Sequence, residues 1–195
     1  MRPMSTITVT TNADSGEGTL RNVIASAADG DTIKFDSSLS GEIITLTSGE
    51  IGIEAGKDLT INGAGADGLS INGNDTSRIF NVDSNQDVPT DLTLQNLTFS
   101  DGYTSDRGGA VQVKYKGALS LDKVNFEDNV ADSGGGAIYS KWDTDLKVKG
   151  SEFDDNQAVA GNDERGAGAI AFVSPGEFTV TDSEFTDNEG INAHF

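Results

Sequence analysis

The sequence predicts an all-β protein: a right-handed parallel β-helix with about three strands per coil and one N-terminal capping α-helix. Two observations lead to this fold class, namely a repeat of nearly constant length and an alternation of apolar and polar residues inside it. A fixed period of this length indicates a solenoid or another repeat architecture. The repeat is marked by phenylalanines that follow one another after 27, 27 and 32 residues: Phe99, Phe126, Phe153 and Phe185.

Each repeat contains three short strands. Leu92 and Leu94 alternate with polar residues, which is the period of a strand with one buried face. Phe99 continues the alternation in the opposite register, so we expect the chain to turn a corner between the first two strands. A third alternating strand follows at 111–113. The predicted corners are 95–96, 122–123, 149–150 and 181–182.

Stacking solves a problem of size, because one repeat cannot bury its own apolar face. Strands of neighbouring coils lie about 4.8 Å apart, so equivalent residues form columns along the axis. A β-propeller is excluded because its blades need about 40–45 residues, and the rule for parallel crossovers favours the right hand. We expect stacked amides, a structural device, at Asn129, Asn156 and Asn188.

One segment of the repeat accepts insertions. The five additional residues of the last repeat all fall between Asn156 and Ala167. Insertions are tolerated in surface loops rather than in a packed scaffold. We therefore expect an exposed loop at Gln157–Gly166 that is free to contact a partner.

The chain is expected to form one domain with two parts. Residues 1–31 hold a first strand and the capping helix, and residues 32–195 form the β-helix. Within the latter, coils are irregular over 32–91 and regular, with the 27-residue period, over 92–188.

The predicted helix has one apolar stripe, with Thr19 as its N-cap and Gly30 just past its end. The end of a solenoid exposes an apolar column and unpaired strand edges, and the helix is placed to cover them. We expect Arg21 to form a structural ion pair. The stripe consists of Leu20, Val23, Ile24, Ala27 and Ala28.

The repeated patterns resemble those of a known family. Phe-x-x-Asn occurs at 126–129, 153–156 and 185–188, and Gly-Gly-Ala-Ile at 135–138. Together they are similar to the repeats of chlamydial polymorphic outer membrane proteins and of other large bacterial surface proteins. The segment 18–24 resembles the N-terminal region named for Cys-Ser-Leu-Arg-Glu-Ala in some secreted β-helix proteins. Both resemblances imply an extracellular β-helix at the bacterial cell surface.

After Asn188 the sequence shows no capping pattern. An uncovered last coil exposes strand edges, which is an aggregation hazard. We therefore expect this chain to be the N-terminal part of a longer natural protein. The alternative is that coils of neighbouring copies stack end to end.

The chain is strongly acidic, with 32 acidic and 13 basic residues and a formal net charge of −19. This balance argues against nucleic acid and against an anionic membrane surface as partners, because both call for a basic patch. No stretch approaches the ~20 apolar residues of a membrane span, so no direct membrane insertion is expected. The absence of cysteine excludes disulfide and thiol chemistry.

The strongest chemical feature is a column of aspartates at one position of the repeat. Carboxylates about 4.8 Å apart raise one another's pKa or require a cation between them. Oxygen ligands at a flexible site suit Ca²⁺, so calcium is the one cofactor predicted. The alternative is that these are turn residues whose side chains point into water. The predicted metal ligands are Asp101, Asp128, Asp155 and Asp187.

The sequence favours an architectural or adhesive function without catalytic residues, in which a rigid module presents loops to a cell-surface glycan or protein receptor. One alternative is a polysaccharide lyase or epimerase, with Arg107 and Arg165 as the candidate basic residues, although the fold alone does not license such an activity. A second alternative is a self-stacking, fibre-forming module. Tyr139 and Trp142 follow the second small-residue pattern, and the alternation predicts that Tyr139 points outward, where it could stack on a sugar.

Overall fold

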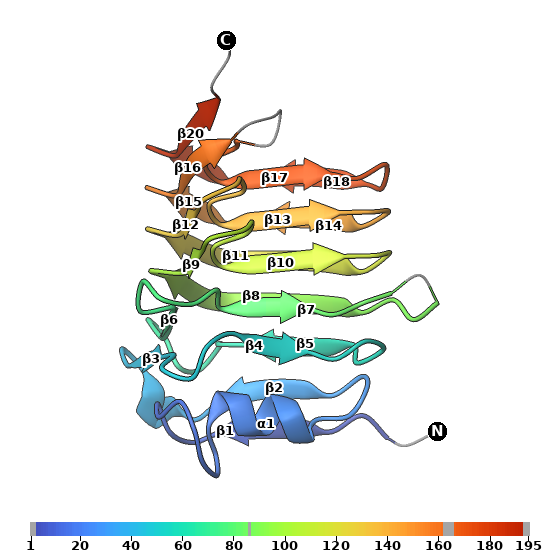
Figure 1. Ribbon diagram of the computed structural model, residues 1–195. Coiled ribbons are helices and arrows are strands. Elements are labelled where there is room, and N and C mark those ends of the chain that lie inside the picture. The colour runs from blue at the N-terminus through green and yellow to red at the C-terminus, as the bar shows by residue number, and fades with distance from the viewer. Residues whose placement is uncertain (1–2, 86, 162–165, 193–195) are drawn as a thin grey trace.

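The computed structural model describes residues 3–85, 87–161 and 166–192. Successive coils stack along one axis, with the N-terminus at the bottom and the C-terminus at the top of Figure 1. The strand pairs of the described residues are parallel and form three sheets. One sheet runs the length of the stack, whereas the second begins at residue 51 and the third at residue 103. The predicted parallel β-helix with one N-terminal α-helix is confirmed.

The sheets are named here by their order along a coil. The first sheet contains β1 (Thr6–Val9), β2 (Thr32–Phe35), β3 (Ile43–Thr45), β5 (Leu59–Asn62), β6 (Ser70–Asn72), β8 (Asp91–Ser100), β11 (Ala118–Glu127), β14 (Asp145–Lys149), β15 (Glu152–Asp154), β18 (Phe178–Thr181) and β19 (Glu184–Thr186). The second sheet contains β4 (Ile51–Ile53), β7 (Phe80–Val82), β10 (Val111–Lys114), β13 (Ile138–Lys141) and β17 (Ile170–Val173). The third sheet contains β9 (Tyr103–Thr104), β12 (Val130–Ala131), β16 (Gln157–Gly161) and β20 (Glu189–Asn192).

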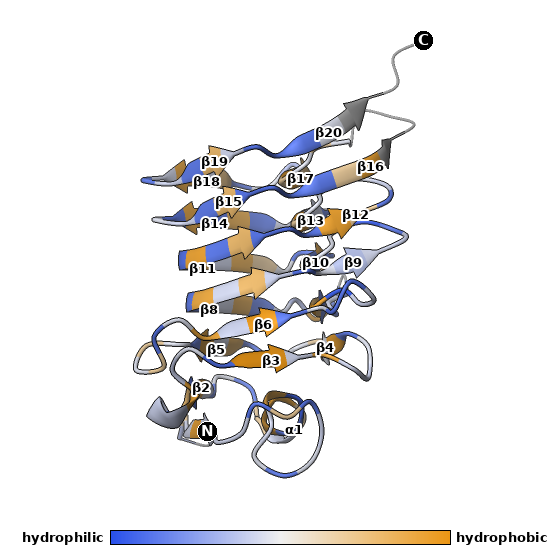
Figure 2. Ribbon diagram, turned by 90° about the vertical axis from the view of Figure 1, so that its left-hand side faces the viewer, coloured by the Kyte–Doolittle hydropathy of each residue, from blue (hydrophilic) through white to orange (hydrophobic). Residues whose placement is uncertain are grey.

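The predicted corners of the regular coils are each turned by one residue with a left-handed backbone. Asn96, Lys123, Gly150 and Asp182 have φ values of 52°, 58°, 56° and 51°. One such residue bends the strand and reverses which side chains face inward. This is the reason why the alternation changes register between Leu94 and Phe99, and hydrophilic and hydrophobic residues accordingly alternate along β8 and β11 (Figure 2).

The interior is a set of columns shared by neighbouring coils. The four marker phenylalanines occupy one register position, and their ring centroids are 5.4, 4.8 and 4.6 Å apart from Phe99 to Phe185. Phe126 and Phe153 are buried. Stacked rings at these separations add about 0.5–1.5 kcal/mol per pair beyond the burial of their area, so the column both fills the core and fixes its register.

The predicted amide ladder is also present. Asn129 donates from Nδ2 to Oδ1 of Asn156, and Asn156 donates in the same way to Asn188, both at 2.9 Å. Each amide also donates to a main-chain carbonyl, as Asn129 does to Phe99 at 3.0 Å. Asn129 and Asn156 are fully buried, so the ladder satisfies polar groups that would otherwise be stranded inside the stack.

The glycine pairs of the small-residue pattern allow close approach between coils. A Cβ at Gly109 would collide with the carbonyl oxygen of Gly136, and a Cβ at Gly136 would collide with that of Gly168. The second glycine of each pair is therefore required by packing against the next coil, and not only by the turn that it makes.

The helix α1 (Leu20–Ser26) covers the lower edge of the second sheet, where it packs beneath β4 (Figures 1 and 2). Its N-cap is Thr19, whose side chain accepts from the amide of Asn22 at 3.2 Å. Four residues of the predicted stripe are buried, whereas Ala28 lies beyond the end of the helix and is half-buried. The helix thus takes the place of a strand in the first coil, while β1 forms the edge of the first sheet.

Arg21 makes the predicted structural ion pair. Its Nη2 lies 2.8 Å from Oδ1 of Asp14, and its guanidinium also donates to the carbonyls of Gly49 and Glu50. Burial raises the pKa of Asp14, but hydrogen bonds from Ser48, Arg21 and the amide of Thr47 outweigh it and lower the pKa to about 2.

Three parts of the strand prediction were wrong. The segments on either side of the predicted corner, expected as two strands, lie in one sheet as β8 and β11, and the strands β9 and β12 of the third sheet were not predicted. The strand β4 was not predicted, because Gly52 leaves only two apolar residues in it. The predicted loop Gln157–Gly166 begins with a strand, β16, which pairs with β12 and β20 in the third sheet. The inserted residues thus follow a strand, and residues 162–165 of the predicted loop lie outside the described part of the chain.

Candidate functional site

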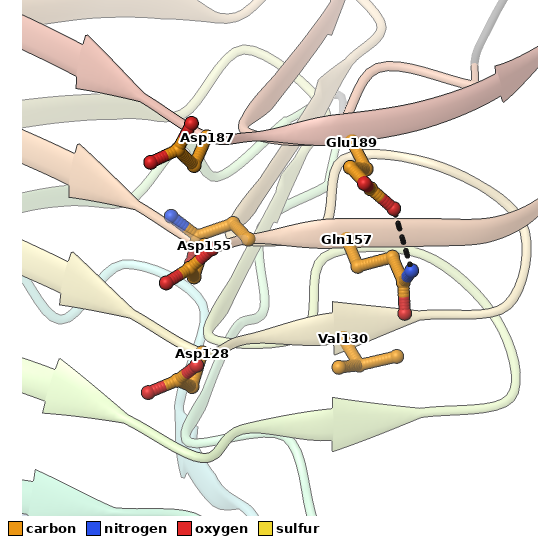
Figure 3. A pocket seen from close by; sticks show the side chains of 7 residues that line it. Asp128, Val130, Asp155, Gln157, Asp187 and Glu189 are labelled. Atoms are coloured by element: carbon orange, nitrogen blue, oxygen red, sulfur yellow. Dashed lines mark hydrogen bonds between the residues drawn. The ribbon is translucent and has the colours of Figure 1, made fainter.

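The four predicted metal ligands lie at one corner of successive coils. Asp101, Asp128, Asp155 and Asp187 have left-handed backbones with φ between 50° and 54°, a conformation that Asp and Asn tolerate better than most residues. The last three lie one above another (Figure 3). The aspartate column predicted from the repeat therefore exists as a geometric feature.

The column borders a shallow hollow of about 310 Å³ on the outside of the solenoid. Beside it, Gln157 donates from Nε2 to Oε2 of Glu189 at 3.2 Å, the dashed line in Figure 3. The residues that line the hollow are Asp128, Val130, Asp155, Asn156, Gln157, Asp187 and Glu189. Four of these seven are carboxylates, so the hollow is strongly acidic.

Like charges in this region change the titration of two carboxyl groups. Burial, followed by the charges of Asp101 and Asp155, raises the pKa of Asp128. Burial, followed by the charge of Asp128, raises the pKa of Glu127. The column therefore carries an electrostatic cost at neutral pH, which either a proton or a cation would reduce.

Calcium binding at the column stays a prediction. Among the described residues, no group of three or more His, Cys, Asp and Glu side chains is arranged to hold a metal ion. Asp128, Asp155 and Asp187 are exposed, and the side chain of Asn72 donates to Asp101. Exposed aspartates at left-handed corners also fit the alternative, in which they are turn residues that point into water.

The basic residues considered for catalysis are not gathered in a groove. Nη1 of Arg107 lies 3.4 Å from Oδ1 of Asp106, and its guanidinium carbon lies 5.4 Å from the centre of the Tyr139 ring. Arg165 lies outside the described residues. No pattern in the sequence pointed to a third arginine, the buried Arg78. Its guanidinium donates to the carbonyls of Arg107 and Gly108, and its Nη1 lies 2.5 Å from Oε2 of Glu50. Through these contacts Arg78 holds the loop that contains Arg107 and Gly108 against the sheet.

The prediction that Tyr139 is exposed and could stack on a sugar was wrong. Tyr139 is only 2% exposed. Its strand does turn this side chain away from the core, but Arg107 and Gly108 from the preceding coil lie against it. The neighbouring side chain, Gln112, is also buried and donates to the carbonyl of Arg107 at 3.4 Å. At β10 and β13 the outer face of the second sheet is thus covered by the chain itself.

The exposed Trp142 was named from the sequence, but its pairing with the half-buried Tyr115 was missed. Tyr115 and Trp142 stack with ring centroids 4.4 Å apart, at the turns that follow β10 and β13. Their separation of 27 residues equals the period of the repeat, and that offset could have revealed them. We call them the aromatic turn pair.

The described helices include none that is long and apolar enough to cross a membrane. In a comparison with family models, the one for the right-handed β-helix region matches residues 43–195. This match covers more than half of the chain and supports the predicted hand of the solenoid. A search of curated proteins found no match.

Proposed function

The chain belongs to the family of right-handed β-helix proteins, and on that premise we propose that it is a structural and adhesive module of the bacterial cell surface. In this function the stacked coils serve as a rigid support, and the outer turns contact a glycan or protein receptor. The β-helix fold itself is shared by surface proteins and polysaccharide-active enzymes, so the choice rests on features of this chain.

One observation carries the proposal: the internal ladders continue without a break from coil to coil. Ring contacts run from Phe80 through Phe99 to Phe185, and the amide ladder accompanies them from Asn129 to Asn188. Because each inner coil is bonded to the coils on both sides, bending the rod would break several contacts at once. Such stiffness suits a support that holds a binding surface away from the cell.

The repeat patterns give a second line of support. Phe-x-x-Asn supplies the stacked phenylalanine and amide, and Gly-Gly-Ala supplies the close contact between coils, so both patterns that resemble the chlamydial surface proteins have structural roles here. The segment around Arg21, which resembles the Cys-Ser-Leu-Arg-Glu-Ala region, caps the stack. These resemblances favour an extracellular location.

A polysaccharide lyase or epimerase is less favoured. Such enzymes act on acidic sugar polymers, and the hollow along the aspartate column is lined by four carboxylates that would repel a polyuronate. The guanidinium of Arg107 is engaged with Asp106 and Tyr139. Neither feature offers the basic groove that a chain of uronic acids needs.

The test is a glycan array and a cell-adhesion assay with the purified chain, followed by incubation of each bound glycan. Binding without release of a shortened or unsaturated product is the expected result. The appearance of unsaturated uronide absorbance would overturn the proposal in favour of a lyase. Absence of binding to glycans, to cells and to surface proteins would leave the adhesive function without support.

Self-stacking is a second candidate function, favoured by one observation. On the last described coil, Phe178, Val180 and Phe185 are 43%, 40% and 45% exposed, and their columns could be continued by another copy of the chain. Sedimentation velocity over a range of concentrations distinguishes the two functions. Assembly into long rods would favour stacking, whereas a monomer at high concentration would exclude it.

A further inference from the structure

Two segments of the chain match the acceptor sequence for attachment of a glycan to asparagine, which is Asn-x-Ser/Thr with any residue except proline at x. They are Asn-Asp-Thr at 74–76 and Asn-Leu-Thr at 96–98. A match of three residues arises often by chance in a chain rich in Asn and Thr, so the motif alone decides nothing. The structure separates the two segments, because it places them in different surroundings.

The first segment is an exposed turn at the corner that follows β6. Asn74, Asp75 and Thr76 are all exposed. Asn74 and Asp75 have left-handed backbones, with φ values of 57° and 52°. The regular coils turn this corner with one left-handed residue, such as Asp101, whereas this coil uses two. Asn tolerates a left-handed backbone well, which accounts for Asn74 but not for Thr76.

The main chain of this turn is held without the side chain of Asn74. The amide of Asn74 donates to Oδ1 of Asn72 at 2.7 Å, and the amide of Asp75 donates to the carbonyl of Asp101 in the next coil at 2.9 Å. Within the described part of the chain, no group is hydrogen-bonded to the Asn74 side chain. Both protons on its Nδ2 are therefore available to an enzyme.

The hydroxyl of Thr76 is also accessible. Its Oγ1 makes one long hydrogen bond, 3.5 Å to the carbonyl of Gly73, and the side chain is exposed. Asn74 and Thr76 belong to the same turn, so an enzyme that binds the hydroxyl can also reach the amide two residues before it. Both groups that define the acceptor sequence are thus presented together.

The second segment is built into the first sheet. Leu97 is buried, and Thr98 lies within β8, where it pairs with strands on both sides. Nδ2 of Asn96 donates to Oδ1 of Asn62 in the preceding coil at 3.0 Å. Attachment of a glycan to Asn96 first requires that this hydrogen bond and the local strand pairing be broken. The fold therefore offers one acceptor and withholds the other.

We propose that Asn74 is a glycosylation site and that the fold keeps Asn96 unmodified. The donor is a sugar activated by a phosphate leaving group, carried by a nucleotide or by a lipid. Nδ2 of Asn74 forms a bond to C1 of the sugar, and the bond between C1 and the phosphate oxygen breaks. The phosphate leaves with the electron pair of that bond, and one amide proton passes to a base of the transferase.

The inference rests on the proposed location at the cell surface, where a bulky and solubilising glycan faces water. A group attached to the exposed side chain of Asn74 extends away from the sheets. We therefore expect the solenoid to carry it without rearrangement and with an unchanged melting temperature.

Trypsin separates the two segments, which makes the test direct. Cleavage after Lys57, Arg78 and Arg107 gives a peptide of residues 58–78 with the first segment and a peptide of residues 79–107 with the second. In the chain isolated from the cells that make it, mass spectrometry should find a glycan on 58–78 and none on 79–107. A series of single hexoses would identify a nucleotide-linked donor, and an oligosaccharide of one size a lipid-linked donor.

A soluble N-glycosyltransferase supplied with UDP-glucose tests whether the fold makes the selection. On the folded chain we expect at least about tenfold more hexose on Asn74 than on Asn96, because Asn96 must first lose a hydrogen bond and its strand pairing. The synthetic peptides 58–78 and 79–107 have no such contacts, so we expect the enzyme to modify both at similar rates.

Variants locate the acceptor without disturbing the fold. Thr76→Ala should abolish the modification of Asn74, and Thr76→Ser should keep it. Thr98→Ala is the matched control and should leave the modification of Asn74 unchanged. Asn74→Asp removes the acceptor but suits a left-handed backbone as Asp101 does, so it should lose the glycan and retain the melting temperature.

The remaining outcomes overturn the inference. An unmodified peptide 58–78 from the natural chain would refute the site. Equal modification of Asn74 and Asn96 in the folded chain would refute the selection by the fold, and a glycan that persists in Thr76→Ala would refute the acceptor sequence. The proposed adhesive function has its own readout in cell adhesion, so an unmodified chain that adheres would lose this site and keep its function.

Discussion

Replacement of Asn156 by alanine tests whether the amide ladder stabilises the stack. Asn156 is fully buried. Its Oδ1 accepts from the main-chain amide of Asn129 at 3.1 Å and from its side chain at 2.9 Å. Its Nδ2 donates to the carbonyl of Phe126 and to Oδ1 of Asn188, both at 2.9 Å.

The expected loss follows from these four hydrogen bonds. At about 1 kcal/mol net for each, Asn156→Ala lowers the free energy of unfolding by about 4 kcal/mol. The true loss is at least of this order, because the buried groups of Asn129 and Phe126 lose their partners without gaining water. A domain is typically stable by about 5–15 kcal/mol, so the variant should be severely weakened.

Urea unfolding measures this loss. Far-ultraviolet circular dichroism follows the whole solenoid, and the fluorescence of Trp142 follows the neighbouring coil, so agreement of the two midpoints checks for two-state unfolding. Asn22→Ala is the matched control, since Asn22 is exposed on α1, and it should change stability by less than about 0.5 kcal/mol. A loss below about 1 kcal/mol in Asn156→Ala would refute the structural role of the ladder.

Four further predictions concern the core, the cap and the aspartate column. Phe153→Ala should cost about 3–5 kcal/mol of unfolding free energy by chemical denaturation, because the buried ring is stacked on both sides. The pKa of Asp14 is lowered in the folded chain, so above the unfolded pKa of 3.8 its ionised form stabilises the fold by at most about 2 kcal/mol. This stability is lost as the pH falls toward 2. Acid titrations should show the loss in the natural chain and not in Asp14→Asn. The raised pKa of Asp128 means that its charged form destabilises the fold above that pKa and ceases to do so on acidification. Asp128→Asn should therefore raise the melting temperature at neutral pH and low salt, and an unchanged value would show that the repulsion is screened. Calcium should raise the melting temperature of the natural chain and not of Asp155→Asn; no shift in either would remove the calcium hypothesis.

The interior of the solenoid was predictable because it follows from periodicity alone. A strand position that recurs every 27 residues must lie on itself in the next coil, and this condition places Phe126 on Phe153 and Asn129 on Asn156. The corners were predictable for a related reason, since a change of alternation between Leu94 and Phe99 has no other simple geometric cause.

The outside of the solenoid was less predictable because alternation says only which side chains leave the core. It does not say whether another segment then covers them, and Tyr139 was wrongly expected to be exposed for this reason. The aromatic turn pair was missed for a different reason. Rules of turn propensity expect Asn or Gly at positive φ, and they give no weight to Tyr115 or Trp142 at such a position.

The single-residue corners have a consequence for how the length of this protein can vary. A corner made by one residue such as Lys123 cannot take up part of a coil, so we expect the regular coils that share this corner to be added or removed only in whole periods. Excision of residues 119–145 would join Ala118 to Leu146 and bring Phe99 directly under Phe153. The rod would lose about 4.8 Å and little else. Duplication or loss of one 27-residue coil would therefore change the length of the solenoid while keeping the contacts in its interior.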